Sequence, residues 1–265
     1  MRVAFTKMHG AGNDYVFVDG ITTSFPLERA GELARAWSDR HFGIGADGLI
    51  VLARGSEAPV RMSMWNADGS RGAMCGNGLR CLARFAHLRG HLREARFAIE
   101  TDAGLRRVEL LAGDLVRTGM GSVQCGEPRL VRLGERELEL VPGDAGNPHA
   151  VVFVDDTEQA DVCGIGAQLQ RHAAFPDGVN VEFVQRLAPD RLRQRTYERG
   201  SGETLACGTG AAVAVVAARA CGWLSGESAT VVLRGGELRV SGSAAALAIE
   251  GPARTVFAGE IELPE

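Results

Sequence analysis

The 265-residue sequence is poor in lysine and in tyrosine. Lys7 is the single lysine, and two tyrosines stand against ten phenylalanines. A pyridoxal-phosphate enzyme holds its cofactor as a Schiff base on a lysine, so only Lys7 could serve that chemistry. The net charge is −4 at neutral pH, and arginine supplies nearly all of the basic charge. This balance argues against a basic nucleic-acid-binding surface, and we expect no nucleic-acid partner.

Long apolar segments and paired-cysteine motifs are also missing. The longest apolar run, Ala211–Ala218, is too short to cross a bilayer, and the first ten residues lack the apolar core of a signal peptide. The six cysteines form no C-x-x-C pair and no zinc-site spacing. These absences predict a cytoplasmic protein with reduced thiols, no metal and no membrane contact. Four cysteines are interpreted as buried or incidental: Cys81, Cys125, Cys163 and Cys221.

One five-residue motif occurs twice. It reads Met-Cys-Gly-Asn-Gly at Met74–Gly78 and Ala-Cys-Gly-Thr-Gly at Ala206–Gly210, so that Cys207 follows Cys75 by 132 residues. Further identities recur at the same offset, among them Gly90 with Gly222, Gly104 with Gly236, and Arg107-Val108 with Arg239-Val240. Because the order of the matches also agrees, we favour an internal duplication over coincidence in a chain rich in glycine and alanine.

The duplication predicts two halves. We expect residues 1–118 to carry Cys75 and residues 119–265 to carry Cys207, with the tail 253–265 able to pack on the first half. Each Cys-Gly-X-Gly is followed by a helix-compatible segment, Gly76–Arg89 or Gly208–Cys221, and short strand signals surround both. The predicted fold class is α/β (α+β), with two pseudo-symmetric domains that each curl a mixed β-sheet around a central helix.

Leu27–Ser38 and Gly164–Arg171 are further predicted helices. Ala211–Ala218 is apolar on every side, which indicates a buried helix. Gly90 and Gly222 fit the glycines that end helices. The segment Thr255–Leu263 predicts one more strand.

The repeated motif suits proton transfer at carbon. A cysteine at a helix N-terminus meets the positive end of the helix dipole, which lowers its thiol pKa. Two such thiols from two similar halves can remove a proton from one face of a carbon and deliver one to the other face. Backbone amides at Gly76, Asn77, Gly208 and Thr209 form candidate sites for a substrate carboxylate.

Four segments carry a resemblance to a known family: Lys7–Asp19, Asn66–Cys81, Gly146–Val154 and Tyr197–Gly210. Together, in order and nearly end to end, they resemble diaminopimelate epimerase, a cofactor-independent amino-acid epimerase of lysine and cell-wall synthesis. The resemblance implies that no cofactor is needed and that the substrate is a small diamino diacid. It also implies that Cys75 and Cys207 are the catalytic acid/base pair.

The resemblance also implies the remaining site residues. Asn13, Asn66, Asn147 and Asn180 match substrate-contacting positions, and for Asn13 alone a turn asparagine is the simpler reading. Glu198 and Arg199 match positions that hold the distal ammonium and carboxylate of the substrate. His149 and Glu198 match positions that tune the thiol pKa values.

Two features are less regular. Some family members have a substrate-touching glutamine where this chain has Gly48, which leaves the substrate fit open. Arg71 and Arg80, beside the first cysteine, could steer a dianionic ligand, but solvated surface charges are an equal interpretation.

The leading hypothesis is an isomerase that interconverts LL- and meso-2,6-diaminopimelate. The alternatives are a two-cysteine racemase of another amino acid, a redox protein that pairs Cys75 with Cys207, and a non-catalytic amino-acid-binding module. Whether the protein forms a homodimer is left open.

Overall fold

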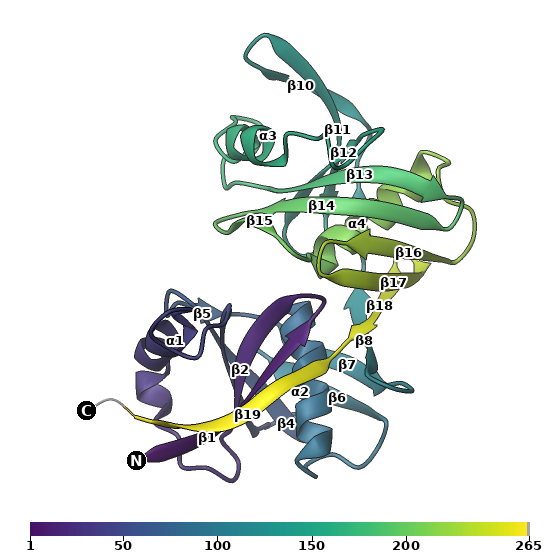
Figure 1. The fold of residues 1–265 in the computed structure, drawn as a ribbon. Helices are drawn as coiled ribbons and strands as arrows, with labels where there is room; N and C mark the ends of the chain where they lie inside the picture. Colours follow the sequence, from purple (N-terminus) through teal and green to yellow (C-terminus); the bar gives the residue numbers. More distant parts are fainter. Residues whose placement is uncertain (264–265) are drawn as a thin grey trace. The chain divides into compact units, whose positions relative to one another are not determined.

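The computed structural model describes residues 1–263. The chain forms two compact units (Figure 1). Unit 1 comprises Met1–Thr118 together with the described residues from Gly251 on, and unit 2 comprises Gly119–Glu250. Within the described residues, no helix is both long and apolar enough to cross a membrane.

The strands of unit 1 pair in an order that contains two parallel steps. Strands β2 and β3 are parallel, as are β4 and β6, and the other neighbours are antiparallel. The order is β19 (Arg254–Glu262), β1 (Arg2–Gly10), β2 (Asn13–Asp19), β3 (Gly48–Arg54), β4 (Val60–Asn66), β6 (Arg96–Thr101), β7 (Gly104–Leu110) and β8 (Leu115–Gly121). The short β5 (Arg71–Gly72) pairs with β4.

Unit 2 repeats this pattern. Its order is β10 (Arg129–Leu133), β11 (Arg136–Asp144), β12 (Pro148–Phe153), β13 (Asn180–Ala188), β14 (Arg191–Glu198), β16 (Ser228–Leu233), β17 (Gly236–Ser243) and β18 (Ala246–Pro252). The parallel steps are β12–β13 and β14–β16. Two short strands, β9 (Gln124–Cys125) and β15 (Gly202–Thr204), pair with β11 and β14.

Helices occupy the same crossovers in both units. A parallel pair cannot be joined by a tight turn, so the chain crosses over through a helix. Helix α1 (Ala30–Ser38) links β2 to β3 and α3 (Val162–Leu169) links β12 to β13, while α2 (Gly76–Leu88) and α4 (Gly208–Ala220) precede β6 and β16. The two-part pseudo-symmetric α/β fold predicted from the repeat is therefore confirmed.

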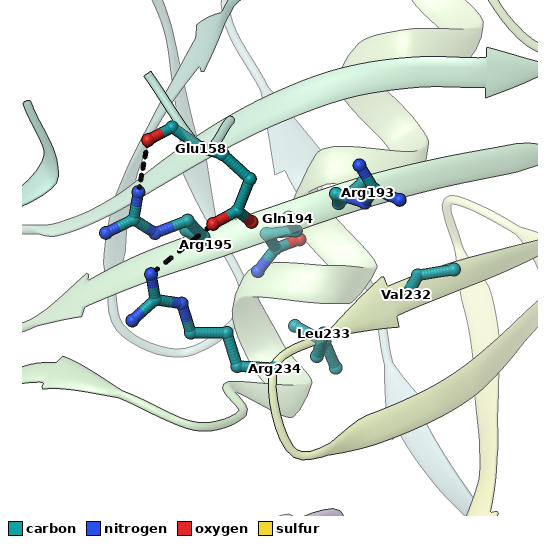
Figure 2. Close-up of a pocket in the computed structure, with 7 residues that line it drawn as sticks. All are labelled: Glu158, Arg193, Gln194, Arg195, Val232, Leu233 and Arg234. Carbon is teal, nitrogen blue, oxygen red and sulfur yellow. Dashed lines mark hydrogen bonds and ion pairs between the residues drawn. The ribbon is translucent and has the colours of Figure 1, made fainter. Parts of the chain in front are cut away.

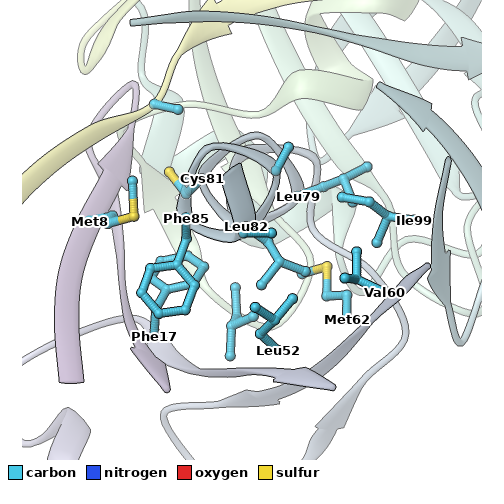
Figure 3. Close-up of a cluster of buried hydrophobic side chains, with 14 of the residues drawn as sticks. Met8, Phe17, Leu52, Val60, Met62, Leu79, Cys81, Leu82, Phe85 and Ile99 are labelled. Carbon is cyan, nitrogen blue, oxygen red and sulfur yellow. The ribbon is translucent and has the colours of Figure 1, made fainter. Parts of the chain in front are cut away.

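The inner strands of unit 1 are apolar on both faces because helices cover both. Side chains alternate along β2: Tyr15 and Phe17 pack with α2, whereas Val16 and Val18 pack with α1. Figure 3 shows Leu79, Leu82 and Phe85 of α2 directed at the strand residues of this core. Unit 1 thus has two apolar clusters, one around α1 and one around α2, the helix that begins at its motif cysteine.

Helix α4 behaves as its composition predicts. Nearly every residue between Gly210 and Ala218 is buried, which is the expected state of a helix with no polar face. Gly90 and Gly222 follow the ends of α2 and α4 with φ of 77° and 73°, a left-handed conformation that glycine adopts without strain.

Two helix starts differ from the prediction. The segment predicted as Leu27–Ser38 begins with the 3₁₀ turn η1 (Leu27–Arg29) before α1. The helix predicted at Gly164–Arg171 lies at Val162–Leu169, because the Asp161 carboxylate accepts the Gly164 amide at 2.9 Å and caps an earlier start.

The buried thiol of Cys81 generates a prediction about stability. Burial raises the pKa of Cys81 to about 12, so the folded protein holds this proton at pH values where the unfolded chain releases it. Its contribution to the free energy of unfolding is full below pH 9 and is lost as the pH rises toward 12. Replacing Cys81 by alanine should make this alkaline loss shallower by about 1 kcal/mol per pH unit, as measured by urea unfolding between pH 8 and 10. An unchanged slope would contradict this account.

Candidate active site

A tight hairpin turn positions Asn13. Gly10 and Asn13 pair at the ends of β1 and β2, and the two residues between them have positive φ, 52° at Ala11 and 94° at Gly12. Positive φ at both central positions is typical of the turn that matches the strand twist. A left-handed alanine is strained, and the burial of its methyl group holds it there.

Cys75 lies at the start of α2. It is the N-cap residue, with an extended backbone (φ −127°, ψ 125°), and its side chain is partly buried. The Tyr15 hydroxyl donates to the Cys75 sulfur at 3.2 Å. The backbone amides of the first helical turn and this hydroxyl both stabilise negative charge on sulfur.

Two predicted substrate asparagines contact each other. The side-chain amide nitrogen of Asn77 donates to Oδ1 of Asn13 at 2.9 Å, and Oδ1 of Asn77 accepts from the Arg80 guanidinium. Arg80 has no exposed surface, so its interpretation as a solvated charge is wrong. Arg71, in contrast, is exposed; it pairs with Asp102 at 2.7 Å and stacks on Trp65.

Asn66 sits opposite Gly48 in the β3–β4 pairing. Its side chain donates to the Ser70 hydroxyl at 3.0 Å. A Cβ atom on Gly48 would lie 2.2 Å from the Trp65 carbonyl oxygen, so this backbone leaves no room for any side chain there. The departure at Gly48 is therefore a packing requirement of this hairpin.

A charged cluster holds the loop between α1 and β3 against the turn of Asn13. Lys7 pairs with Asp14 at 2.9 Å, and Arg40 bridges Asp14 and Asp47 at 2.7 and 2.9 Å. Burial and the neighbouring Asp14 charge raise the pKa of Asp47. The single lysine thus serves a structural ion pair.

Cys207 has the equivalent place in unit 2. It is the N-cap of α4, with φ −121° and ψ 113°, and it is 5% exposed. The Gly210 amide donates to its sulfur at 3.4 Å, and the Thr209 hydroxyl lies at the same distance. Burial, followed by the charges of Glu198 and Glu182, raises the pKa of Cys207 well above its ordinary value, so the lowering predicted for a cysteine at a helix N-terminus is wrong for this thiol.

His149 belongs to a polar chain in which it and Glu182 are buried and Asn147 is partly buried. Its Nδ1 lies 2.9 Å from Glu182 Oε1 and its Nε2 lies 3.0 Å from Asn147 Oδ1. Both contacted atoms are acceptors, so an imidazolium satisfies both. The second Glu182 oxygen has no hydrogen-bond partner among the described residues. Glu182 is a residue that the sequence analysis missed.

Glu198 and Asn180 complete this part of unit 2. The Thr204 hydroxyl donates to Glu198, and burial, reinforced by the Glu182 charge, raises the pKa of Glu198. Asn180 is buried, donates to the Pro148 carbonyl at 3.1 Å and accepts the Arg199 amide at 2.9 Å. The Arg199 guanidinium is exposed and donates to the Asp177 carbonyl at 3.1 Å.

The predicted residues therefore fall into two clusters, each within one unit. The cluster of unit 1 contains Asn13, Cys75, Gly76 and Asn77, with Asn66 on the neighbouring β4. The cluster of unit 2 contains Asn147, His149, Asn180, Glu198, Arg199, Cys207, Gly208 and Thr209. Tyr15 and Glu182 were missed, although each is two residues beyond a predicted asparagine and so shares its face of a strand.

A small cavity of unit 2 lies apart from these residues. Its volume is about 70 Å³, and it is lined by Glu158, Arg193, Gln194, Arg195, Val232, Leu233 and Arg234 (Figure 2). Arg195 pairs with Glu203 at 2.8 Å, and Arg234 pairs with Glu203 at 3.2 Å and with Glu158 at 3.6 Å. Carboxylates already compensate these guanidinium charges, so we assign no ligand to the cavity.

Solved structures show the class of fold. The chain is similar to a PhzF-family phenazine biosynthesis protein from Bacillus anthracis, with a TM-score of 0.78, 16% identity and coverage of 99% of this chain and 100% of that one. It is also similar to a hydroxyproline epimerase from Agrobacterium vitis, with a TM-score of 0.74, 18% identity and coverage of 100% and 93%. The protein thus has the two-unit α/β fold of these proteins.

Sequence comparison gives the family. The model of the diaminopimelate epimerase family matches residues 5–126 and 143–256. A diaminopimelate epimerase of Alkalilimnicola ehrlichii is 44% identical over 99% of this chain and all of the relative, and one of Geobacillus thermodenitrificans is 42% identical over 96% and 95%. The chain belongs to the diaminopimelate epimerase family, and the predicted resemblance is confirmed.

Gly48 offers a test of the β3–β4 packing. Replacing Gly48 by alanine should lower the free energy of unfolding by about 2 kcal/mol, because the new Cβ displaces the Trp65 carbonyl. Gly76→Ala is the stability control, since its Cβ would meet nothing within 4 Å. Thermal unfolding of both variants measures the difference, and equal stabilities would show that the hairpin can relax.

Glu182 offers a test of the electrostatics around Cys207. The Glu182 charge raises the pKa of Cys207, so Glu182→Gln should lower the midpoint pH of Cys207 alkylation by about one unit. Glu203→Gln is the control, because its carboxylate pairs with Arg195 instead. Peptide-resolved mass spectrometry after iodoacetamide treatment reads each cysteine separately. A midpoint that rises or stays constant would refute this assignment.

Proposed function

We propose that this protein is an epimerase that interconverts LL- and meso-2,6-diaminopimelate without pyridoxal phosphate, in lysine and peptidoglycan-precursor synthesis. Membership of the diaminopimelate epimerase family supports the proposal. The observation that carries the mechanism is that two topologically equivalent helices, α2 and α4, each begin at a cysteine with an extended backbone.

The chemistry proceeds in two proton transfers. The α-carbon–hydrogen bond of the substrate breaks, its proton passes to a thiolate sulfur, and the electron pair stays on carbon beside the carboxylate. A new carbon–hydrogen bond then forms on the opposite face with the proton of the second thiol, which becomes the thiolate. Inversion needs two groups, since a single base that returns its own proton retains the configuration.

Backbone amides supply the electrostatic help that a pyridine ring would otherwise give. The substrate carboxylate gains charge as the carbanion forms, and backbone amides at the starts of α2 and α4 are preorganised donors for it. Gly76 and Gly208 keep these approaches open: a Cβ on Gly76 would meet nothing within 4 Å, and one on Gly208 would meet only Ile249 at 3.8 Å.

The second amino-acid centre of the substrate accounts for Glu198 and Arg199 in this proposal. Glu198 would oppose the distal ammonium, and the exposed Arg199 guanidinium would bind the distal carboxylate through its planar fork. A monocarboxylic amino acid would leave both charges unmatched. We also propose a reducing compartment, the cytoplasm, because a disulfide between the two thiols would remove both acid and base.

Proton exchange tests the two-thiol mechanism. Purified protein in deuterated water should incorporate deuterium at the α-carbon of LL-diaminopimelate, and Cys75→Ala and Cys207→Ala should each reduce the turnover by about a thousandfold. Cys221→Ala, at an exposed cysteine, is the control. Full activity in both single variants would refute the mechanism.

A substrate panel tests the specificity. If proline, hydroxyproline or histidine turns over faster than diaminopimelate, the substrate is a monocarboxylic amino acid and the proposed specificity is wrong. If no amino acid exchanges its α-proton but the protein cycles between dithiol and disulfide, the redox alternative takes over.

A further inference from the structure

Arg80 is a cation with no exposed surface, and the mechanism above does not use it. Among residues 1–263, no carboxylate lies within ion-pair distance of its guanidinium. Its hydrogen-bond acceptors are all neutral: Oδ1 of Asn77, the Gly76 carbonyl at 3.3 Å and the Pro252 carbonyl at 3.5 Å. A guanidinium stays charged in proteins, so α2 contains an uncompensated positive charge in its second turn. Burying an unpaired charge costs free energy because the charge loses its hydration, so we expect Arg80 to have a role that offsets this cost.

The surrounding backbone makes room for this group. Gly10 ends β1 against it, and a Cβ on Gly10 would lie 3.3 Å from Nη2 of Arg80 and 3.0 Å from the Asn77 carbonyl. Pro252 approaches from the far end of the sequence. The end of β1, the start of α2 and Pro252 are distant in sequence and together enclose the Arg80 side chain, which forms no ion pair among the described residues.

The guanidinium fixes the orientation of two amides. It can only donate, so the atom of Asn77 that faces it must be Oδ1. The Asn77 nitrogen is thereby directed to Asn13, which must accept with its own Oδ1 at 2.9 Å. The nitrogen of Asn13 is then left as the donor of that side chain, which is the polarity needed to bind a carboxylate.

The same charge acts on the nearby sulfur atoms. Burial lowers the pKa of Arg80, and the Cys81 and Cys75 sulfurs oppose that change, so the attraction between Arg80 and the sulfurs is mutual. Cys81 is held protonated by burial, which leaves Cys75 as the sulfur that can ionise. The groups that interact with the Cys75 sulfur within unit 1 include the Tyr15 hydroxyl from β2, through a hydrogen bond, and Arg80 and Cys81 from α2, through charge.

The second unit lacks this cation. The 132-residue offset places Ala212 where α2 has Arg80, and it places Glu182 where β3 has Ile50. The two cysteines therefore stand in opposite surroundings, with a buried cation on one side and buried carboxylates on the other.

We propose that Arg80 is a positioning residue for the first thiol: its buried guanidinium aligns the Asn77–Asn13 amide pair for a carboxylate and makes Cys75 ionise at lower pH than Cys207. The proposal deepens the proposed epimerase function and rests on it for the role of the thiolate. The alkylation readout below needs no substrate, so the two can fail separately.

The test is the midpoint pH of alkylation of each cysteine, read by peptide mass spectrometry in the whole protein. In the wild type, Cys75 should have a lower midpoint than Cys207. Arg80→Met should raise the Cys75 midpoint and slow its alkylation at pH 7 by about tenfold, with Cys207 unchanged. Arg89→Met, which removes the same charge at the C-cap of α2, should leave both midpoints as they are.

Arg80→Lys separates charge from orientation. Lysine keeps the charge but lacks the planar fork, so the Cys75 midpoint should stay near the wild-type value while the KM for the substrate rises more than kcat falls. A folded Arg80→Met protein with an unchanged Cys75 midpoint would overturn the proposal. If that variant does not fold, two other results would overturn the proposal. One is a wild-type Cys75 midpoint equal to or above that of Cys207. The other is a Cys75 midpoint in Arg80→Lys that differs from the wild type by a full pH unit. A wild type inactive on every diamino diacid, with these midpoints as expected, would refute the function and leave the Arg80 assignment standing.

Discussion

The close approach of a helix start to a sheet is the constraint on which both clusters depend. The second glycine of each Cys-Gly-X-Gly presses against the strand behind it: a Cβ on Gly78 would lie 2.6 Å from Ile50, and one on Gly210 would lie 2.4 Å from Glu182. Any larger residue would push the helix away from the sheet. That displacement would move the cysteine, which is the N-cap only three residues earlier, away from its neighbours. The spacing of the motif is thus set by packing, and the thiol chemistry follows from it.

The two units share a topology but not an electrostatic environment. In unit 1 the strand behind the helix offers an aliphatic side chain and the helix carries a buried cation. In unit 2 the strand offers a buried carboxylate and the helix carries alanine. Burial and the two nearby carboxylates favour the neutral thiol at Cys207, whereas hydroxyl, amide and guanidinium donors surround the start of α2. Such a difference in surroundings sets which of the two sulfurs gives up its proton at the lower pH.

The repeat, the helices and the position of both cysteines could be predicted because each depends on short segments of neighbouring residues. Residues that act through distant neighbours could not be. Arg80 reads as a surface arginine until Gly10 and Pro252 close over it, and those residues are 70 and 172 positions away. The role of Gly48 depends on the register that places it beside Trp65 and Asn66. Tyr15 and Glu182 carry a weak signal, since both follow a predicted asparagine by two residues on a strand.

The matching order of strands has a consequence for the origin of the molecule. An ancestor built from two identical half-length chains would present two equivalent sulfurs, each with the same affinity for a proton. Fusion of the halves into one polypeptide allows each to mutate alone, and the halves now differ at two related places, Ile50 against Glu182 and Arg80 against Ala212. The single chain can therefore give its two cysteine sulfurs different proton affinities, which two identical chains could not.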